Sequence, residues 1–271
     1  MPIVLLSKWS YTSGTTVAER LCSLLQCESI EGEVLAEASM RSGIPRDKLE
    51  RAFNEPPSFF GMSAVARKVC VAHVQAALST RLLKDHALYD GPFGVHLIRG
   101  VSHVLTVRIQ SDLEDRVALK VQRDGGVPDD ARKSIQEQDR HRLALARLLF
   151  DADDDNDDVY DVSINTSRID VNTAVELIVE RARQDRLKPT TYSVACLEEQ
   201  ALAHRVRATL VDLDPEVEVA VHSGTVSVRI RAQGLRAKKK ISLAHQRAAG
   251  IEGVGNLKIE QVKDPLARFA L

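Results

Sequence analysis

Short apolar runs separated by polar loops open the chain. Residues 3–6 are continuously apolar, which predicts a buried strand, and a loop rich in Ser and Thr follows at residues 7–16. The next apolar residues recur at i, i+4, i+7 and i+8, which predicts an amphipathic helix: Val17, Leu21, Leu24 and Leu25. A strand, a loop and a helix in this order are typical of the start of an α/β unit.

Two further strands, each followed by a helix, are predicted at residues 104–109 and 160–165. After the first of these, Ser111-x-x-Glu114 predicts a capping box and a helix to about residue 122. Gly125-Gly126 breaks the chain, and Pro128 fits the first turn of a long helix to about residue 150. Together with helical inserts before residue 85, these units predict an α/β fold with a parallel sheet flanked by helices.

The pattern changes after residue 190. A helix at residues 194–210 precedes two strands of alternating polarity, 217–221 and 226–230, joined by a hairpin turn at residues 222–225. A helix at about 235–248 and a strand at about 257–262 complete an αββαβ order. These residues are enough for a small α+β domain with a modest core.

The charge balance supports the same division. Residues 1–180 hold 21 Lys and Arg against 28 Asp and Glu, a net charge of −7, whereas residues 181–271 hold 16 against 10, a net charge of +6. The four cysteines form no CxxC pair, which argues against zinc and against a disulfide framework. With no apolar run that could span a bilayer and no export signal, we expect a soluble cytoplasmic protein.

The first loop is the first candidate site. A phosphate-binding loop needs glycines around the phosphate, a lysine for its charge and a Ser or Thr for magnesium. Gly14 and Thr16 stand at the last glycine and the hydroxyl position, but Trp9 replaces the first glycine and Thr15 replaces the lysine. Taken alone, the loop fits an ordinary Ser/Thr-capped strand–helix turn better.

Three charged segments also have two interpretations. The helices between residues 112 and 150 carry arginines suited to phosphoryl groups, although a solvated face of ion pairs is favoured when these helices are considered in isolation. Residues 151–158 hold six aspartates in eight positions without the glycine and glutamate of a calcium loop, which favours a solvated connection. Residues 229–240 are basic and could attract an anionic ligand, nucleic acid or lipid, and a solvated face is the simpler alternative.

The first 183 or so residues resemble the cytidylate kinase-like family of P-loop kinases. The matching stretches are Leu113-Glu114-Asp115-Arg116-Val117, Arg123-Asp124-Gly125, Ala131-Arg132, Asp139-x-x-Arg142, 160–168 and, less specifically, Pro56-Pro57-Ser58-Phe59. The resemblance implies a P-loop kinase-like fold, ATP and Mg²⁺ as cofactors, and arginine-rich helices that close over ATP. It also implies site residues: Arg123, Arg132, Asp139 and Arg142 as catalytic, Thr12, Ser13, Gly14, Thr15 and Thr16 around the nucleotide, and Thr16 at the metal.

The departures from that family concern its chemistry. Tyr11 and Ser13 stand in a loop that is glycine-rich in the family, and Gly91-Pro92-Phe93 replaces a Gly-Arg-Gly motif that helps to hold the monophosphate. Two hypotheses therefore remain: ATP-dependent phosphoryl transfer to CMP or dCMP, or an inactive pseudokinase that senses a nucleotide or another ligand.

The C-terminal part is similar to a BON domain in its αββαβ order and in residues 250–257, which would make it a second ligand-binding module. The expected division is a kinase-like domain at 1–186, a linker at 187–193 and a BON-like domain at 194–265.

Overall fold

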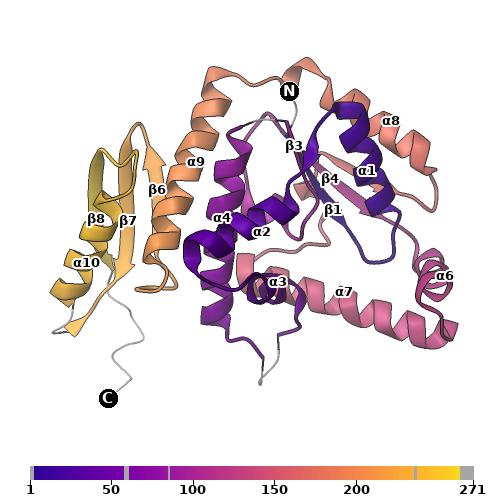
Figure 1. The fold of residues 1–271 in the computed structure, drawn as a ribbon, viewed down its shortest axis with the longest axis horizontal. Coiled ribbons are helices and arrows are strands. Elements are labelled where there is room, and N and C mark those ends of the chain that lie inside the picture. The colour runs from indigo at the N-terminus through magenta and orange to yellow at the C-terminus, as the bar shows by residue number, and fades with distance from the viewer. Residues whose placement is uncertain (1–2, 58–60, 85, 235–236, 263–271) are drawn as a thin grey trace.

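A computed structural model describes residues 3–57, 61–84, 86–234 and 237–262. A parallel five-stranded sheet in the order β2-β3-β1-β4-β5 forms the centre of its larger part (Figure 1). Its strands are β1 (Ile3–Lys8), β2 (Glu28–Ser29), β3 (Ala87–Tyr89), β4 (Val104–Gln110) and β5 (Val162–Asn165). The central strand β1 is continuously apolar from Ile3 to Leu6 because helices cover both faces of the sheet there.

Helices form a layer on each face of this sheet. On one face, α1 (Gly14–Leu25) and α8 (Val171–Ala182) bury one core with Val4 and Leu6. On the other face, Ile3 and Leu5 belong to a second core. Four helices contribute most of that core, α2 (Glu31–Ser42), α3 (Arg46–Asn54), α4 (Ala64–Leu82) and α5 (Gly94–Leu97), and two later helices add a few residues. The α/β class with a parallel sheet flanked by helices is therefore confirmed.

Two helices joined by a short turn, α6 (Leu113–Asp124) and α7 (Pro128–Phe150), extend beside the sheet and are called the α6–α7 hairpin below (Figure 1). The predicted break is present, since Gly125 and Gly126 have φ values of 77° and 100°, which favour glycine. The predicted capping box is wrong. Asp112 is the N-cap of α6, the Ser111 hydroxyl bonds to that of Thr166 at 2.7 Å, and Glu114 pairs with Arg132.

The C-terminal part has the predicted αββαβ order. It consists of α9 (Thr191–Leu210), β6 (Glu218–His222), β7 (Thr225–Arg231), α10 (Ala237–Ala249) and β8 (Asn256–Val262). The strands form a separate sheet in which β7 pairs antiparallel with β6 and parallel with β8. Two 3-10 turns, Asp157–Val159 and Asp185–Leu187, complete the regular structure of the described residues.

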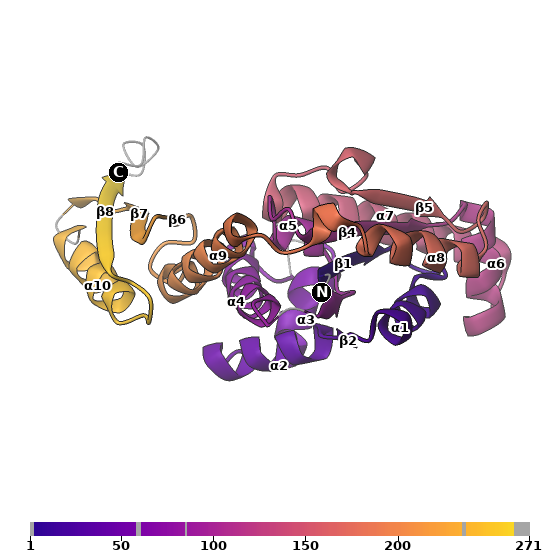
Figure 2. The same cartoon turned by 90° about the horizontal axis from the view of Figure 1, so that it is seen from above.

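Helix α9 joins the two parts, lying between α4 and the small sheet in both views (Figures 1 and 2). Leu197 belongs to the core of the larger part, whereas Val206 and Leu210 belong to the core of the small sheet. Alanines at the α4–α9 contact, Ala76 and Ala208, let the two helices approach closely. The helix begins at Thr191, which lies inside the expected linker.

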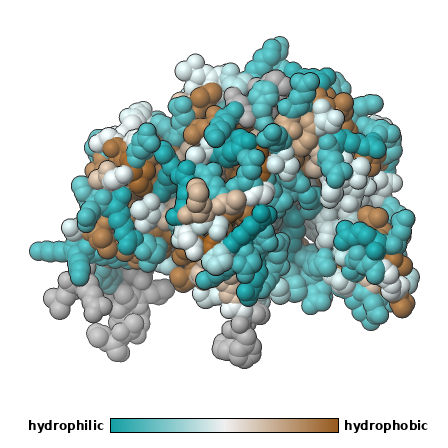
Figure 3. Space-filling view, viewed as in Figure 1, coloured by the Kyte–Doolittle hydropathy of each residue, from teal (hydrophilic) through white to brown (hydrophobic). Residues whose placement is uncertain are grey.

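The visible surface is largely hydrophilic, with small and separated apolar patches (Figure 3). In the part of the chain that the structure describes, no helix combines the length and the apolar character required to cross a bilayer.

Candidate functional site

A cleft of about 630 Å³ opens at the carboxyl ends of β1 and β3, the edge of a parallel sheet at which ligands bind. Three parts of the chain line it: the loop after β1, the residues after β2 and β3 together with the end of α3, and the α6–α7 hairpin. The lining residues used below are Lys8, Trp9, Tyr11, Thr12, Thr15, Glu31, Asn54, Asp90, Pro92, Phe93, Arg123, His141 and Arg142.

Tyr11 ties the loop to helix α6. Its backbone is left-handed, with φ of 57°, a conformation that favours glycine. Its hydroxyl donates to Asp124 at 2.6 Å and accepts from Lys120 at 2.9 Å, and its ring lies 4.4 Å from the Lys120 amine. The Tyr11 hydroxyl, with help from Arg123 and Lys120, lowers the pKa of Asp124 to about 2. At Tyr11 the loop thus keeps a backbone conformation typical of glycine, while the Tyr11 side chain binds to α6.

The rest of the loop satisfies part of its own hydrogen-bonding capacity. The Thr12 hydroxyl donates to the Trp9 carbonyl at 2.9 Å and accepts from the Gly14 N–H at 3.3 Å, so this N–H is already engaged. Thr15 and Thr16 are both exposed, and of the two only Thr15 lines the cleft. Ser13 is the N-cap of α1 without a side-chain hydrogen bond to the helix.

Trp9, at the position of the missing first glycine, is surrounded by guanidinium groups. The central carbons of Arg108, Arg116 and Arg142 lie 5.2, 5.4 and 6.0 Å from its ring, within the range of cation–π attraction. Arg116 also donates to the Ser10 carbonyl at 2.9 Å. The indole therefore occupies space next to the arginines that could otherwise face a phosphate.

The predicted catalytic residues near the sheet form internal ion pairs. Arg142 donates to Asp154 at 2.5 Å, to the Ser7 hydroxyl at 2.8 Å and to the Lys8 carbonyl at 3.0 Å. Asp139 does not face the cleft but accepts both terminal nitrogens of Arg116, at 2.7 and 2.8 Å. These contacts hold α7 and α6 against the end of β1.

The other two predicted arginines differ in their surroundings. Arg132 joins the two helices of the hairpin by a bidentate pair with Glu114 at 2.7 and 3.0 Å, and it is not among the residues that line the cleft. Arg123 lines the cleft, and its side chain is 68% exposed. It contacts Asp124 and the Tyr11 ring. Of the four predicted catalytic residues, the cleft therefore brings together Arg123 and Arg142.

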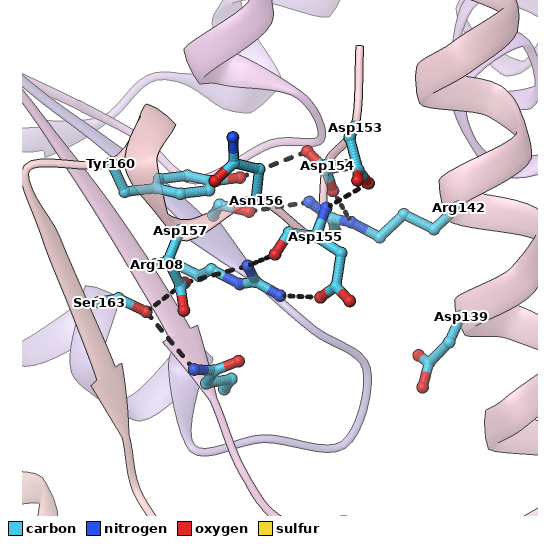
Figure 4. Close-up of polar contacts among 12 residues, drawn as sticks. Arg108, Asp139, Arg142, Asp153, Asp154, Asp155, Asn156, Asp157, Tyr160 and Ser163 are labelled. Atoms are coloured by element: carbon cyan, nitrogen blue, oxygen red, sulfur yellow. Dashed lines mark hydrogen bonds and ion pairs between the residues drawn. The ribbon is translucent and has the colours of Figure 1, made fainter.

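The aspartate-rich segment is more than a solvated connection (Figure 4). Asp154 is completely buried and accepts from Arg142 and from Tyr160, while its other close neighbour is the His96 ring at 2.8 Å. Burial raises the pKa of Asp154, but the His96 hydrogen bond and the Arg142 charge outweigh this and lower it below its usual range. Among the described residues, no group of three or more His, Cys, Asp or Glu side chains could hold a metal ion.

Two more aspartates of this segment compensate a second buried cation, Arg108 of β4. Its guanidinium donates to the Asp155 carboxylate at 2.7 Å and to the Asp157 carboxylate at 3.1 Å (Figure 4). The Asp155 and Asp157 side chains remain 60% and 56% exposed, so the expectation of a solvated loop holds for them, and it is wrong only for the buried Asp154.

Lys8, the last residue of β1, is a cleft residue that the motif comparison missed. Its amine lies 2.5 Å from Asp90, which follows β3, and Asp90 also accepts from the Ser29 hydroxyl at 2.7 Å. Parallel strands that end at one edge bring these three residues together. The only signal in the sequence is the position of each residue at or just after a strand end.

The side of the cleft near β2 and β3 is acidic. Glu31 and Asp90 line it with Asn54, and no arginine from residues 90–93 joins them, since Pro92 stands there. Burial and the neighbouring Asp90 raise the pKa of Glu31. The Lys8 amine reaches this side but is paired with Asp90, so little unpaired positive charge remains for a phosphomonoester.

The basic segment at residues 229–240 is partly neutralised. Arg229 pairs with Glu218 at 2.6 Å and with Glu260 at 3.5 Å, and the Lys240 amine donates to the Arg231 carbonyl. Arg236 lies outside the described residues, as do Ser58 and Phe59 of the Pro56-Pro57-Ser58-Phe59 motif.

Comparisons with known proteins agree with this architecture. The cytidylate kinase-like family matches residues 3–168. A crystal structure of an uncharacterized protein from Eubacterium ventriosum ATCC 27560 is similar in fold, with a TM-score of 0.52 and 15% identity. The similarity covers 67% of this chain and 97% of that chain. No curated protein matches the chain.

Proposed function

The chain belongs to the cytidylate kinase-like family, and on that premise we propose that its cleft binds a nucleotide without transferring a phosphoryl group to CMP or dCMP at a kinase's rate. The observation that carries this proposal is the internal neutralisation of the cations near the cleft. Arg142 is paired with the buried Asp154, Arg116 with Asp139, and Lys8 with Asp90. Phosphoryl transfer depends on free positive charge around the transferred group.

The acidic side of the cleft supports the same proposal. An acceptor monophosphate would meet the Glu31 and Asp90 carboxylates where relatives of the family use an arginine. Loss of one such positive charge typically costs ~3 kcal/mol of transition-state stabilisation. We therefore expect CMP to bind weakly.

The cofactors ATP and Mg²⁺ fit the loop only in part. The Thr12 and Thr15 side chains line the cleft, so their hydroxyls can hydrogen-bond to a phosphate or to a metal-bound water. Mg²⁺, when bound with ATP, would supply charge neutralisation at the phosphates. The exposed Thr16 is not placed toward the cleft, so we assign no metal contact to it.

One observation favours the alternative of an active kinase. Arg123 lines the cleft and remains 68% exposed, so it is available to a phosphate group. Slow transfer to CMP or dCMP would then depend on Arg123.

Thermal unfolding of the full chain with Mg·ATP, with CMP and with both tests the proposal. We expect a higher melting temperature with Mg·ATP, little change with CMP, and no ADP release in a coupled assay. The absence of any shift would contradict nucleotide binding. Release of ADP that depends on CMP, and is lost in R123Q, would establish the active kinase instead.

For the C-terminal part we propose a BON-like module. The αββαβ order and a core of its own support it, since Val206, Val228 and Ala244 pack together there. This module would provide a second ligand-binding site on the protein, as the sequence resemblance implies.

A further inference from the structure

The phosphate loop of this chain has no lysine at the expected position, where Thr15 stands. A cation at that point normally neutralises the terminal phosphates of the nucleotide. Among the residues that line the cleft, only three carry a permanent positive charge: Lys8, Arg123 and Arg142. Arg142 is held by the buried Asp154, and Arg123 belongs to the α6–α7 hairpin, so Lys8 is the one of these three cations that comes from the strand directly before the loop.

The path of the Lys8 side chain explains why position 14 of the loop motif is a glycine. A Cβ added to Gly14 would lie 2.5 Å from the Lys8 Cβ and 3.3 Å from its Cδ. The aliphatic part of Lys8 therefore passes directly against Gly14, at the first turn of α1. Gly14 has no room for a side chain because Lys8 occupies that space.

The amine at the end of this path is partly accessible. The Lys8 side chain is 27% exposed and the Asp90 side chain 12%, and both line the cleft. Asp90 is also held by the Ser29 hydroxyl, and Glu31 adds a second carboxylate nearby. The Asp90 carboxylate holds the amine at the carboxyl edge of the sheet, next to the loop.

We propose that Lys8 takes the role of the absent loop lysine and binds the terminal phosphates of a nucleoside di- or triphosphate, in competition with Asp90. This role rests on the proposed nucleotide binding. It makes Lys8 the residue that favours nucleoside di- and triphosphates over monophosphates. Asp90 holds the amine while the cleft is empty. A phosphate must displace or share this carboxylate, which weakens binding.

Equilibrium binding of Mg·ATP, Mg·ADP and AMP to the full chain tests this role. K8M should lower the affinity for Mg·ATP and Mg·ADP by about tenfold or more, because it removes a charge-assisted hydrogen bond. Its affinity for AMP should change less than twofold. K8R should retain most of the affinity, and D90N should raise the affinity for Mg·ATP above that of the wild type.

The matched control is K84M, which removes an exposed lysine outside the cleft. Melting temperatures of all variants show that each is folded before binding is compared. Equal Mg·ATP affinity of K8M and K84M, in a wild type that does bind, would overturn the role of Lys8. A D90N affinity at or below the wild-type value would overturn the competition. Failure of the wild type to bind any nucleotide would instead refute the proposed function.

Discussion

The buried carboxylate of Asp154 offers the sharpest test of how the helical hairpin is held. Asp154 is completely buried and bonds to Arg142 and His96, and Arg142 in turn holds the end of β1. The substitution D154N keeps the shape of the side chain but removes its charge. It leaves the Arg142 guanidinium, whose side chain is 18% exposed, without its carboxylate.

Removal of one partner from a buried ion pair typically costs ~3–5 kcal/mol, because the other charge remains buried without compensation. The Asn side chain keeps some hydrogen bonding, so we expect a loss of ~3 kcal/mol in the free energy of unfolding. For a chain of this size that corresponds to a melting temperature lower by about 6–12 °C. R142M in the D154N background should cost less than the sum of the two single changes.

The pH dependence has a defined sign. Because the pKa of Asp154 is lowered in the folded state, its stabilisation is fully present above the unfolded pKa of about 3.9. This stabilisation is lost as the pH falls through the lower folded value. D154N should therefore lose less stability than the wild type between pH 4 and pH 2.

Urea unfolding followed by circular dichroism at pH 7 and along an acid series measures both effects. The matched control is D158N in the same segment, since Asp158 is exposed and its carboxylate makes no side-chain contact with any residue that the structure describes. If the urea concentration at the midpoint of unfolding is the same for D154N and D158N, the structural role of the Asp154–Arg142 ion pair is refuted.

Two further changes test the loop. G14A should lower the free energy of unfolding by ~1–3 kcal/mol, because its Cβ would collide with Lys8. G32A in α2 should be neutral or stabilising in the same denaturation assay, because its Cβ would meet only a guanidinium nitrogen of Arg46 at 3.9 Å. If G14A and G32A change the free energy of unfolding by the same amount, the close contact between Lys8 and Gly14 is refuted. Y11F removes the hydroxyl that bonds to Asp124 and Lys120, so the amides of α6 should exchange hydrogen faster while those of α8 stay unchanged. Unchanged exchange in α6 would argue against Tyr11 as the link between loop and helix.

Much of the fold could be predicted from apolar periodicity, because most elements are long enough to show it. The two strands that were missed, β2 and β3, have two and three residues, and Glu28–Ser29 is exposed and polar, so neither shows a strand pattern. Helix α7 was predicted at its full length because Pro128 and the glycines before it define its start.

The site could be predicted less well because its chemistry depends on partners distant in sequence. The residues of the loop and the arginines of the hairpin were found by motif, but the motif does not show that Arg142 is paired with Asp154 or Arg116 with Asp139. Lys8 lies one residue before the loop motif, and its partner Asp90 follows another strand. Only the parallel pairing of β1 with β3 brings them together.

The central claim is that the cleft holds a nucleotide but does not complete phosphoryl transfer. A single-turnover experiment with the full chain in excess over ATP labelled at the γ-phosphate, with Mg²⁺ and CMP, tests it most directly. We predict that the protein retains bound ATP and that the label stays on it. Rapid appearance of labelled CDP, or no bound ATP at all, would contradict the account.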